Sequence, residues 1–325
     1  MRRASPDVSH PPGGKLSNSS KKKQVRIFST VWFKSHVKHN GSPGGKAWAT
    51  QLSLSRAIAV LRVHFLRGQR KMQLSAVISF LIVTTLARAD WKNISSESEP
   101  SPAKGLEHRY LVFENSGTGE RASMELALFS AKSCALRVID QPAEPRLDLA
   151  QAMQREKCLA GVNGGYFDPG YVPIGLLIVD GKTIAPLQRA HLLSGVLSAS
   201  AGRIQISRFG ELSLKPKIDA AVECGPMIVD LGESVRGLES TRPARRTFVA
   251  VAAGNRAALG FCSDVTLADL SAILATDFAT NFKIQRALNL DGGSSSAFWF
   301  KRQNGSAFSV PEEKPVRDFV GIVPK

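Results

Sequence analysis

One stretch of the sequence, from Asn289 to Ser296, limits what this chain can fold into more than any other. It reads Asn-Leu-Asp-Gly-Gly-Ser-Ser-Ser and lies between two apolar segments. Glycine allows backbone angles and close approaches that a Cβ forbids, so we expect a strand, a tight loop and a second strand, with Asp291 where the first strand ends. Exposed amides in such a loop can bind an anion, above all phosphate. The candidates are Gly292, Gly293, Ser294 and Ser295. A plain β-hairpin is the alternative, because Asp-Gly between apolar segments is a strong turn signal.

A second stretch, 159–169, has the same build. An apolar strand ends at Asn163, two glycines follow, and Tyr166 and Phe167 come next. Two loops of the form apolar–Asn/Asp–Gly–Gly therefore lie far apart in the sequence. They could face one another across one cleft, although two unrelated turns would explain the pattern equally well.

The formal charge of +16 is concentrated at the N-terminal end of the chain. Residues 1–71 contain 15 Lys/Arg and a single acid, whereas residues 90–325 contain 27 Lys/Arg and 26 acids. A basic balance indicates nucleic-acid binding only where it lies on the folded part of a protein. We therefore expect no nucleic-acid partner.

The composition predicts a targeting signal at 67–89. Basic residues precede an apolar core at 74–86, and Ala87-Arg88-Ala89 fits the small-x-small cleavage rule. Because such a signal belongs at the true N-terminus, we interpret 1–66 as a disordered or mis-called extension. A long signal region and an uncleaved anchor are the alternatives. The mature chain would start with a linker at 90–107 and continue as one domain at 108–325. We expect it to be exported, periplasmic or extracellular, and without a membrane span.

The cysteine pattern predicts disulfides and no metal. Four cysteines are an even number in a chain expected to be exported, so two disulfides are predicted, with buried free thiols as the alternative. They are Cys134, Cys158, Cys224 and Cys262. No Cys-x-x-Cys occurs, so zinc is unsupported. We predict no cofactor and no metal, and calcium among the loop carboxylates stays open as an alternative.

The hydrophobic pattern predicts many strands and few helices. The expected hairpins are 109–114 with 123–129, 173–182, 192–200 with 203–207, and 247–252 with 257–262. The expected helices are 148–157 and 266–278, and the second begins with a capping-box pattern at Thr266 and Asp269. The predicted fold is therefore α+β, with a mixed, strand-rich sheet and a few helices packed on it.

Five short motifs occur in a fixed order along this domain. They are Val-Asn-Gly-Gly-Tyr-Phe at 162–167, Pro-x-Gly-Leu-Leu-Ile-x-Asp-Gly-Lys at 173–182, Cys-Gly-Pro-Met at 224–227, Arg-Thr at 246–247 and Leu-Asp-Gly-Gly-Ser-Ser at 290–295. Together they resemble the phosphodiester glycosidase family over roughly residues 110–323. The resemblance implies a catalytic domain at 108–325 that hydrolyses the bond between a sugar anomeric carbon and a phosphodiester. Its partner would be a carbohydrate or glycosyl-phosphate substrate.

Such chemistry assigns roles to particular side chains. Glycoside hydrolysis usually takes two carboxylates. A phosphate leaving group needs little protonation, but it needs charge stabilisation, which an arginine can supply in bidentate fashion. We therefore predict that Asp291 is a nucleophile or base and that Arg246 holds the phosphate. The candidates for the second carboxylate are Asp168, Glu223 and Asp264, in that order. Asp168 could instead start a turn, and Asp264 could cap a helix.

Substrate binding is predicted for residues around both loops. Asn163 and Asn289 would position sugar hydroxyls, and Tyr166 or Phe167 could stack on a sugar face, although a core role for Phe167 is at least as plausible. The full predicted set is Asn163, Gly164, Gly165, Tyr166, Gly225, Thr247, Asn289, Gly292, Gly293, Ser294 and Ser295.

Other interpretations remain beside this one. The chain has no Gly-x-Ser-x-Gly, and after residue 90 it has only His108 and His191, which disfavours a Ser-His-Asp triad. A module that binds envelope glycan without catalysis, and a phosphodiesterase that cleaves P–O, are the rivals. Asp291 could merely tie down its loop, and Arg245 and Arg246 could be a solvated pair.

Overall fold

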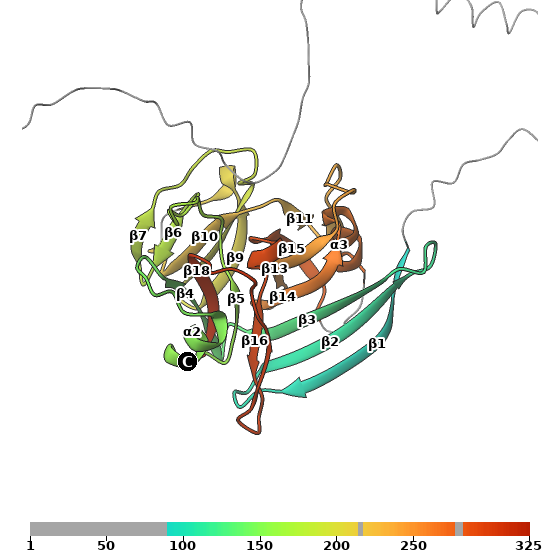
Figure 1. Ribbon diagram of the computed structural model, residues 1–325, viewed down its shortest axis with the longest axis horizontal. Helices are drawn as coiled ribbons and strands as arrows, with labels where there is room; N and C mark the ends of the chain where they lie inside the picture. Colours follow the sequence, from blue (N-terminus) through green and yellow to red (C-terminus); the bar gives the residue numbers. More distant parts are fainter. Residues whose placement is uncertain (1–89, 214–216, 277–281) are drawn as a thin grey trace, which may run out of the picture. The chain divides into compact units, whose positions relative to one another are not determined.

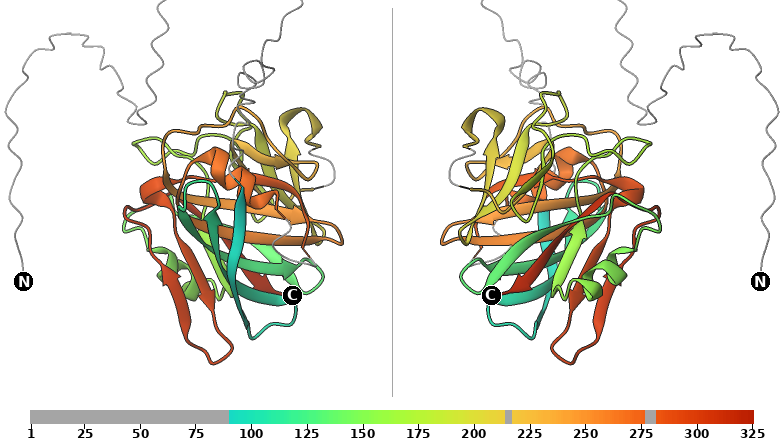
Figure 2. Two further views of the ribbon diagram at one scale, coloured as in Figure 1. Left: turned by 90° about the vertical axis from the view of Figure 1, so that its right-hand side faces the viewer. Right: turned by 90° about the vertical axis from the view of Figure 1, so that its left-hand side faces the viewer.

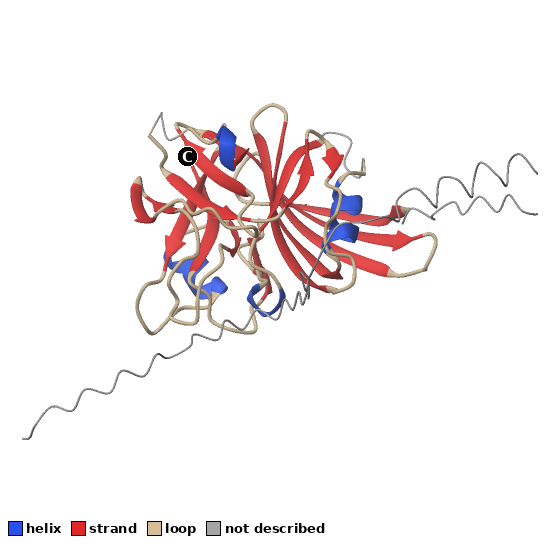
Figure 3. Ribbon diagram, turned by 90° about the horizontal axis from the view of Figure 1, so that it is seen from above, coloured by secondary structure: helices blue, strands red, loops and turns tan. Residues whose placement is uncertain are grey.

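The computed structural model of the protein describes residues 90–213, 217–276 and 282–325. The predicted extension at 1–66 and the predicted signal peptide at 67–89 lie outside these residues. The described chain consists mainly of strands, which form three sheets, and it contains two α-helices and two short 3-10 helices (Figure 1, Figure 3).

The first sheet has eight strands in the order β1-β2-β3-β14-β13-β15-β11-β12. Side chains in β2 largely alternate between buried and half-buried positions, as expected for a strand with one face on a core. The strands are β1 (Trp91–Pro100), β2 (Leu106–Asn115), β3 (Arg121–Ser130), β14 (Arg256–Val265), β13 (Ala244–Ala252), β15 (Ile284–Asn289), β11 (Met227–Asp230) and β12 (Glu233–Ser234).

The other two sheets have five strands each, in the orders β7-β6-β10-β8-β9 and β17-β16-β5-β18-β4. The second sheet contains β7 (Lys182–Ala185), β6 (Leu177–Val179), β10 (Ala220–Cys224), β8 (Gly195–Ser200) and β9 (Arg203–Arg208). The third contains β17 (Ala307–Val310), β16 (Phe298–Lys301), β5 (Ala160–Asn163), β18 (Asp318–Pro324) and β4 (Cys134–Asp140). Figure 2 shows the hairpin of β16 and β17 in dark red.

The strand-rich prediction is confirmed, but the mixed sheet is wrong. Every pairing between the described strands is antiparallel, and the strands divide among three sheets. Antiparallel strands can be joined by short turns, whereas parallel strands need long crossovers, so the many Gly-containing turns already favoured this result. The predicted hairpins are present as the pairs β2–β3, β6–β7, β8–β9 and β13–β14.

The predicted linker at 90–107 is also wrong over most of its length. Residues Trp91–Pro100 form β1, which pairs with β2 along its whole length. This strand lies at the edge of its sheet and is mostly exposed, which explains its polar composition, since natural edge strands are commonly charged. Its first residue, Trp91, is buried, and the indole Nε1 of Trp91 donates a hydrogen bond to Asp269 Oδ1 at 3.1 Å.

The helices begin at the predicted places. Helix α2 (Leu149–Arg155) has Asp148 as its N-cap, and α3 (Leu267–Leu274) has Thr266, whose side chain accepts from the amide of Asp269. Helix α2 packs closely against β5 because Gly161 lacks a side chain: a Cβ there would lie 2.1 Å from Met153 Sδ. The 3-10 helices are η3 (Phe209–Glu211) and η4 (Gly293–Ser295).

The three sheets share one hydrophobic core, to which each contributes buried side chains such as Phe129, Leu197 and Phe300. The cysteines of the protein do not form the predicted disulfides. All four are buried free thiols, as in the alternative interpretation. None of the helices in the described residues is long and apolar enough to span a membrane.

Candidate active site

Both Gly-Gly loops lie at the same end of the strands in the third sheet. Strand β5 ends at Asn163, and its antiparallel neighbours β16 and β18 begin beside that end, with Phe298 opposite Val162 and Phe319 opposite Asn163. The loop 290–297 leaves β15 of the first sheet and enters β16 of the third. Strand, loop and strand are therefore confirmed, and the simple hairpin is wrong, because β15 and β16 belong to different sheets.

Asn163 joins the two loops. Its Oδ1 accepts hydrogen bonds from Thr247 Oγ1 at 2.7 Å and from the Ala297 amide at 3.0 Å, and its Nδ2 donates to the Asp291 carbonyl at 2.8 Å. The Asp291 amide donates in turn to the Gly164 carbonyl at 3.1 Å. The two loops thus face one another, as one of the two interpretations of the sequence expected.

The same contacts give a structural role to three residues that are predicted to bind substrate. Asn163 and Thr247 are fully buried and bond to each other. Asn289 is buried as well, and its Nδ2 donates to the carbonyl of Gly225 at 3.0 Å. That same carbonyl accepts from the Tyr166 hydroxyl at 2.6 Å. These hydrogen bonds hold the two loops in place, and three of the side chains that make them, Asn163, Thr247 and Asn289, are buried.

Asp291 is half-buried at the centre of this arrangement. Its Oδ1 accepts from the Gly292 amide at 3.0 Å. Burial raises the pKa of Asp291 to about 6, although hydrogen bonds from the Ser295 side chain and the Gly292 amide act in the opposite direction. A carboxyl group with a pKa close to neutrality can exchange a proton under physiological conditions, which suits acid–base or nucleophilic chemistry.

Asp318, which the sequence analysis missed, is a second carboxylate at the site. It is the first residue of β18 and is 2% exposed. Its Oδ1 accepts from the Gly165 amide at 3.0 Å, and burial raises its pKa to about 7, with the charges of Asp140 and Asp291 adding to the effect. The available signal was a lone carboxylate beginning the apolar segment 319–323.

Arg246 reaches the site from β13, beside the loop. Its Nε donates to the Val265 carbonyl at 3.0 Å and its Nη2 to the Arg242 carbonyl at 2.8 Å. An ideal Cβ on Gly292 would lie 3.9 Å from Nη1, so this end of the guanidinium faces the loop. The side chain is only 12% exposed, so it is not part of a solvated pair. With two of its three nitrogens engaged, a bidentate grip on phosphate would require part of this network to open.

The three predicted candidates for the second carboxylate have other surroundings. Asp168 Oδ1 accepts from the amides of Gly170 at 2.8 Å and Val172 at 2.9 Å, so it forms a turn, as in the alternative interpretation. Glu223 is buried and accepts from the Leu176 amide at 2.7 Å. Asp264 is exposed on β14, and the cap of α3 is Thr266 instead.

Five glycines and two serines complete the predicted set. Gly292, Gly293 and Ser294 are half-exposed, and Gly293 has a φ of 63°, which explains the need for glycine there. Ser295 is buried. Close packing requires glycine at three other positions, because a Cβ would meet a neighbouring atom at under 3.0 Å. They are Gly164, Gly165 and Gly225.

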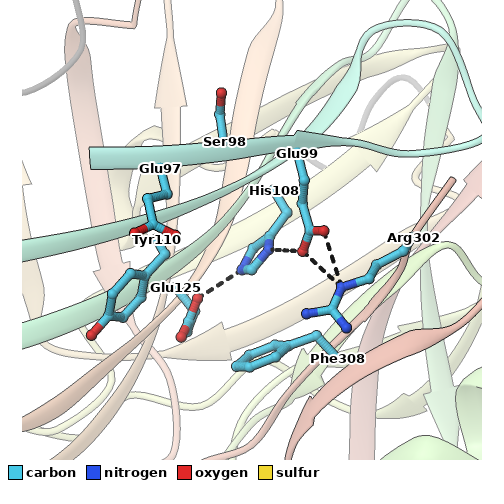
Figure 4. A pocket seen from close by; sticks show the side chains of 8 residues that line it. All are labelled: Glu97, Ser98, Glu99, His108, Tyr110, Glu125, Arg302 and Phe308. Carbon is cyan, nitrogen blue, oxygen red and sulfur yellow. Dashed lines mark hydrogen bonds and ion pairs between the residues drawn. The ribbon is translucent and has the colours of Figure 1, made fainter. Parts of the chain in front are cut away.

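A separate group of ionisable side chains lies on β1, β2 and β3, with His108 and Glu125 buried and Glu99 partly exposed (Figure 4). His108 Nδ1 is 2.8 Å from Glu99 Oε1, and its Nε2 is 2.7 Å from Glu125 Oε2. Arg302 Nε donates to both oxygens of Glu99 at 3.0 Å. These residues and Phe308 line a cavity of about 500 Å³, whose lining does not include Asp291. We call Glu99, His108 and Glu125 the Glu–His–Glu cluster. With Arg302 it links the first sheet to the β16–β17 hairpin.

Solved structures with this fold include an enzyme of known activity. The catalytic domain of zebrafish N-acetylglucosamine-1-phosphodiester alpha-N-acetylglucosaminidase, auto-inhibited by its pro-peptide, aligns with a TM-score of 0.55 and 17% identity, over 71% of this chain and 89% of that one. At this identity the likeness shows the fold alone. A hypothetical protein from Synechocystis aligns with a TM-score of 0.46 and 13% identity, over 73% of this chain and 68% of that one. A protein from Burkholderia pseudomallei aligns with a TM-score of 0.47 and 13% identity, over 64% of this chain and 75% of that one.

No curated protein sequence matches this one. The family model for phosphodiester glycosidases, however, matches residues 156–323, which include both Gly-Gly loops, Arg246 and Asp318. Because this match spans just over half of the chain, the protein belongs to the phosphodiester glycosidase family.

Proposed function

We propose that the protein hydrolyses a glycosyl phosphodiester by cleaving the C–O bond at the sugar anomeric carbon. The observation that carries the proposal is Asp291, a half-buried carboxylate with a raised pKa, held by two facing loops beside the Arg246 guanidinium. Family membership supports the same reaction class. Carboxylates whose pKa is raised toward neutrality by burial are typical of catalytic sites.

In the proposed reaction Asp291 acts in its ionised form, which predominates above its pKa of about 6. The carboxylate attacks the anomeric carbon, or it removes a proton from a water molecule that does so. The anomeric C–O bond breaks, and its electron pair stays on the phosphate oxygen. Because phosphate is a good leaving group, it needs little protonation. Water supplies the hydroxyl of the released sugar, and the other product is a phosphate monoester.

Arg246 is proposed to stabilise the phosphate through Nη1, the guanidinium nitrogen that faces the loop. The partly exposed Gly293 and Ser294 amides are proposed to assist. Charge-assisted hydrogen bonds of this kind are about twice as strong as neutral ones. Tyr166 is half-buried beside Asn289 and is proposed to border the sugar site.

The test is a turnover assay of the full chain on a panel of sugar-1-phosphodiesters, in water labelled with heavy oxygen. Label in the released sugar supports C–O cleavage, and label in the phosphate product supports the rival P–O phosphodiesterase. Glycan binding without release of sugar from any substrate would favour a binding module and contradict the proposal.

Export remains part of the proposed function. The signal at 67–89 would direct the chain out of the cytoplasm, with cleavage after Ala89. Mass spectrometry of the mature N-terminus tests this. A terminus at Asp90 supports export with cleavage, and a peptide from residues 1–60 in the mature protein contradicts it.

A further inference from the structure

We propose that Asp318 is the positioning residue of this site: it holds the Gly164–Gly165 loop by both amides and, through that loop, fixes Asp291. The inference rests on the proposed function, in which Asp291 is the catalytic carboxylate. Asp318 itself is buried and does not touch the substrate.

Three hydrogen bonds connect β18 to Asp291. The Gly165 amide donates to Asp318 Oδ1 at 3.0 Å, and the Gly164 amide donates to the Asp318 carbonyl at 2.9 Å. The Gly164 carbonyl then accepts from the Asp291 amide at 3.1 Å. Asp318 alone therefore accepts hydrogen bonds from the amides of Gly164 and Gly165. The same loop accepts a hydrogen bond from the backbone amide of Asp291.

Close packing explains both glycines of this loop, Gly164 against Asp318 and Gly165 against Val222. A Cβ on Gly164 would lie 1.8 Å from Asp318 Oδ1, and one on Gly165 would lie 2.9 Å from Val222 Cγ1. Any side chain at 164 would push the loop away from the carboxylate and with it the Gly164 carbonyl that holds Asp291. Gly164 is thus a requirement of the Asp318 contact.

The surroundings of Asp318 leave its carboxylate without a bonded cation among the described residues. Arg317, whose charge acts on Asp318, bonds to both oxygens of Asp140, at 2.6 and 3.0 Å, and to the carbonyl of Tyr171 at 2.7 Å. Two further ionisable groups face Asp318 electrostatically, the Cys224 thiol and Asp291. Burial first, and then the charges of Asp140 and Asp291, raise the pKa of Asp318 to about 7, although the hydrogen bond from the Gly165 amide and the charge of Arg317 lower it.

Besides Asp318, two ionisable groups face Asp291 electrostatically, the Tyr166 hydroxyl and the Cys224 thiol. Burial keeps the pKa of Tyr166 and of Cys224 well above their ordinary values, so both stay neutral near pH 7. The two carboxylates therefore carry the negative charge that changes near neutrality, and their ionisation steps belong to the pair. Between pH about 6 and pH about 7, Asp318 is neutral behind an ionised Asp291. Above it, a second negative charge appears behind the site that would bind an anionic phosphodiester.

The experiment compares the full-chain wild type with Asp318→Asn and Asp318→Ala. The Asn variant keeps an acceptor for Gly165 but cannot ionise. We expect the wild-type KM to rise severalfold from about pH 6.5 to about pH 8.5, while the KM of Asp318→Asn stays flat and the acidic limb set by Asp291 stays in place. The Ala variant lacks the acceptor, so its kcat should fall by about 10-fold to 100-fold at every pH.

A buried carboxylate from the Glu–His–Glu cluster provides the matched control. Glu125→Gln removes a charge away from the site and should leave the pH dependence of KM unchanged. An Asp318→Asn enzyme with the wild-type KM profile, or an Asp318→Ala enzyme with wild-type kcat, would overturn the inference.

A second measurement separates this inference from the proposed function. In protein labelled with ¹⁵N-glycine, the Gly165 amide should shift in a step near pH 7 in the wild type, and that step should be absent in Asp318→Asn. This readout needs no turnover. Absence of the step in the wild type overturns the inference even if the enzyme is active. Its presence supports Asp318 ionisation beside the loop even if no substrate is cleaved, an outcome that would count against the proposed function only.

Discussion

Two groups of carboxylates in this protein, each at least partly buried, have opposite surroundings. At the candidate site, the side chains of Asp291 and Asp318 accept hydrogen bonds from backbone amides and a serine hydroxyl, and the pKa of each is raised. In the Glu–His–Glu cluster, Glu99 and Glu125 bond to His108, and Glu99 also bonds to Arg302. Burial alone would raise the pKa of Glu99, but its hydrogen bonds to these two partners lower it overall.

The difference in surroundings distinguishes carboxylates suited to a chemical step from carboxylates that hold the fold together. A carboxylate paired with a cation is held in its charged form and serves as a bridge between elements. A buried carboxylate without such a partner keeps its proton to a higher pH and can exchange it near neutrality. The cavity of about 500 Å³ lies over the paired group, so the unpaired group is the better guide to the active site.

The largest effect is expected for Asp291→Asn, which removes the ionisable group but keeps its size. Turnover should fall by about 10⁴-fold, because the step that needs the carboxylate loses its base or nucleophile. The loss is measured as kcat/KM on the best substrate of the panel, with the far-ultraviolet circular dichroism as a folding control. Glu125→Gln should retain wild-type turnover. Activity of Asp291→Asn within 10-fold of the wild type would mean that the two groups do not differ as described.

The paired group should respond through stability instead. His108→Phe leaves Glu125 buried without its partner and should reduce the free energy of unfolding by about 3–5 kcal/mol. Chemical denaturation of the wild type and the variant measures the difference. The double variant His108→Phe/Glu125→Leu should recover much of the loss, because no buried charge remains. A single variant as stable as the wild type would contradict the structural role of the cluster.

Asp318→Asn should change stability in a pH-dependent way. The folded-state pKa of Asp318 is raised from 3.8 to about 7, so the stabilisation from its bound proton is complete below pH about 3.8 and is lost as the pH rises through about 7. The variant has no such loss. At pH about 8 it should therefore be more stable than the wild type by about 2 kcal/mol, less than the full shift would give, since the ionisation is coupled to that of Asp291. Unfolding curves at several pH values would contradict this if the difference did not grow between about pH 5 and pH 8.

The smallest effect is expected for Glu99→Gln. The side chain of Glu99 is 34% exposed, so solvent screens its interactions and the cost at pH 7 should be below about 1 kcal/mol. Because its pKa is lowered in the folded state, its stabilisation is present above the unfolded pKa and is lost as the pH falls through the folded value. The variant and the wild type should therefore converge in strongly acidic solution. A difference in unfolding free energy that increased in acid would contradict the lowered pKa of Glu99.

Local features of the fold could be predicted from the sequence, and long-range pairings could not. The turns at Asp180-Gly181 and Gly254-Asn255 and the cap at Thr266 are fixed by neighbouring residues. Which sheet each hairpin joins depends on pairings such as that of β14 with β3, for which the chain carries no local signal. The polar strand β1 was mistaken for a linker because an edge strand need not alternate when most of it is exposed.

The candidate site divides in the same way. The Gly-Gly loops were recognised because glycine pairs are rare and have a conformational meaning. The structural role of Asn163 and Thr247 could not be recognised in the same way. A polar side chain that binds a substrate and one that holds two loops together look alike in a sequence. Asp318 was missed because its role depends on β18 lying beside the end of β5. Its residue type alone, at the start of an apolar strand, does not distinguish it from a surface carboxylate.

The four buried thiols have a consequence for measuring how this molecule opens. Cys262 belongs to β14 of the first sheet, Cys224 to β10 of the second and Cys134 to β4 of the third, and Cys158 lies between α2 and β5. A thiol reagent reaches each sulfur only when the surrounding structure opens. The four labelling rates, read separately by peptide mapping, would therefore report the opening of each sheet without any engineered probe. They would reveal whether the sheets open together or one at a time.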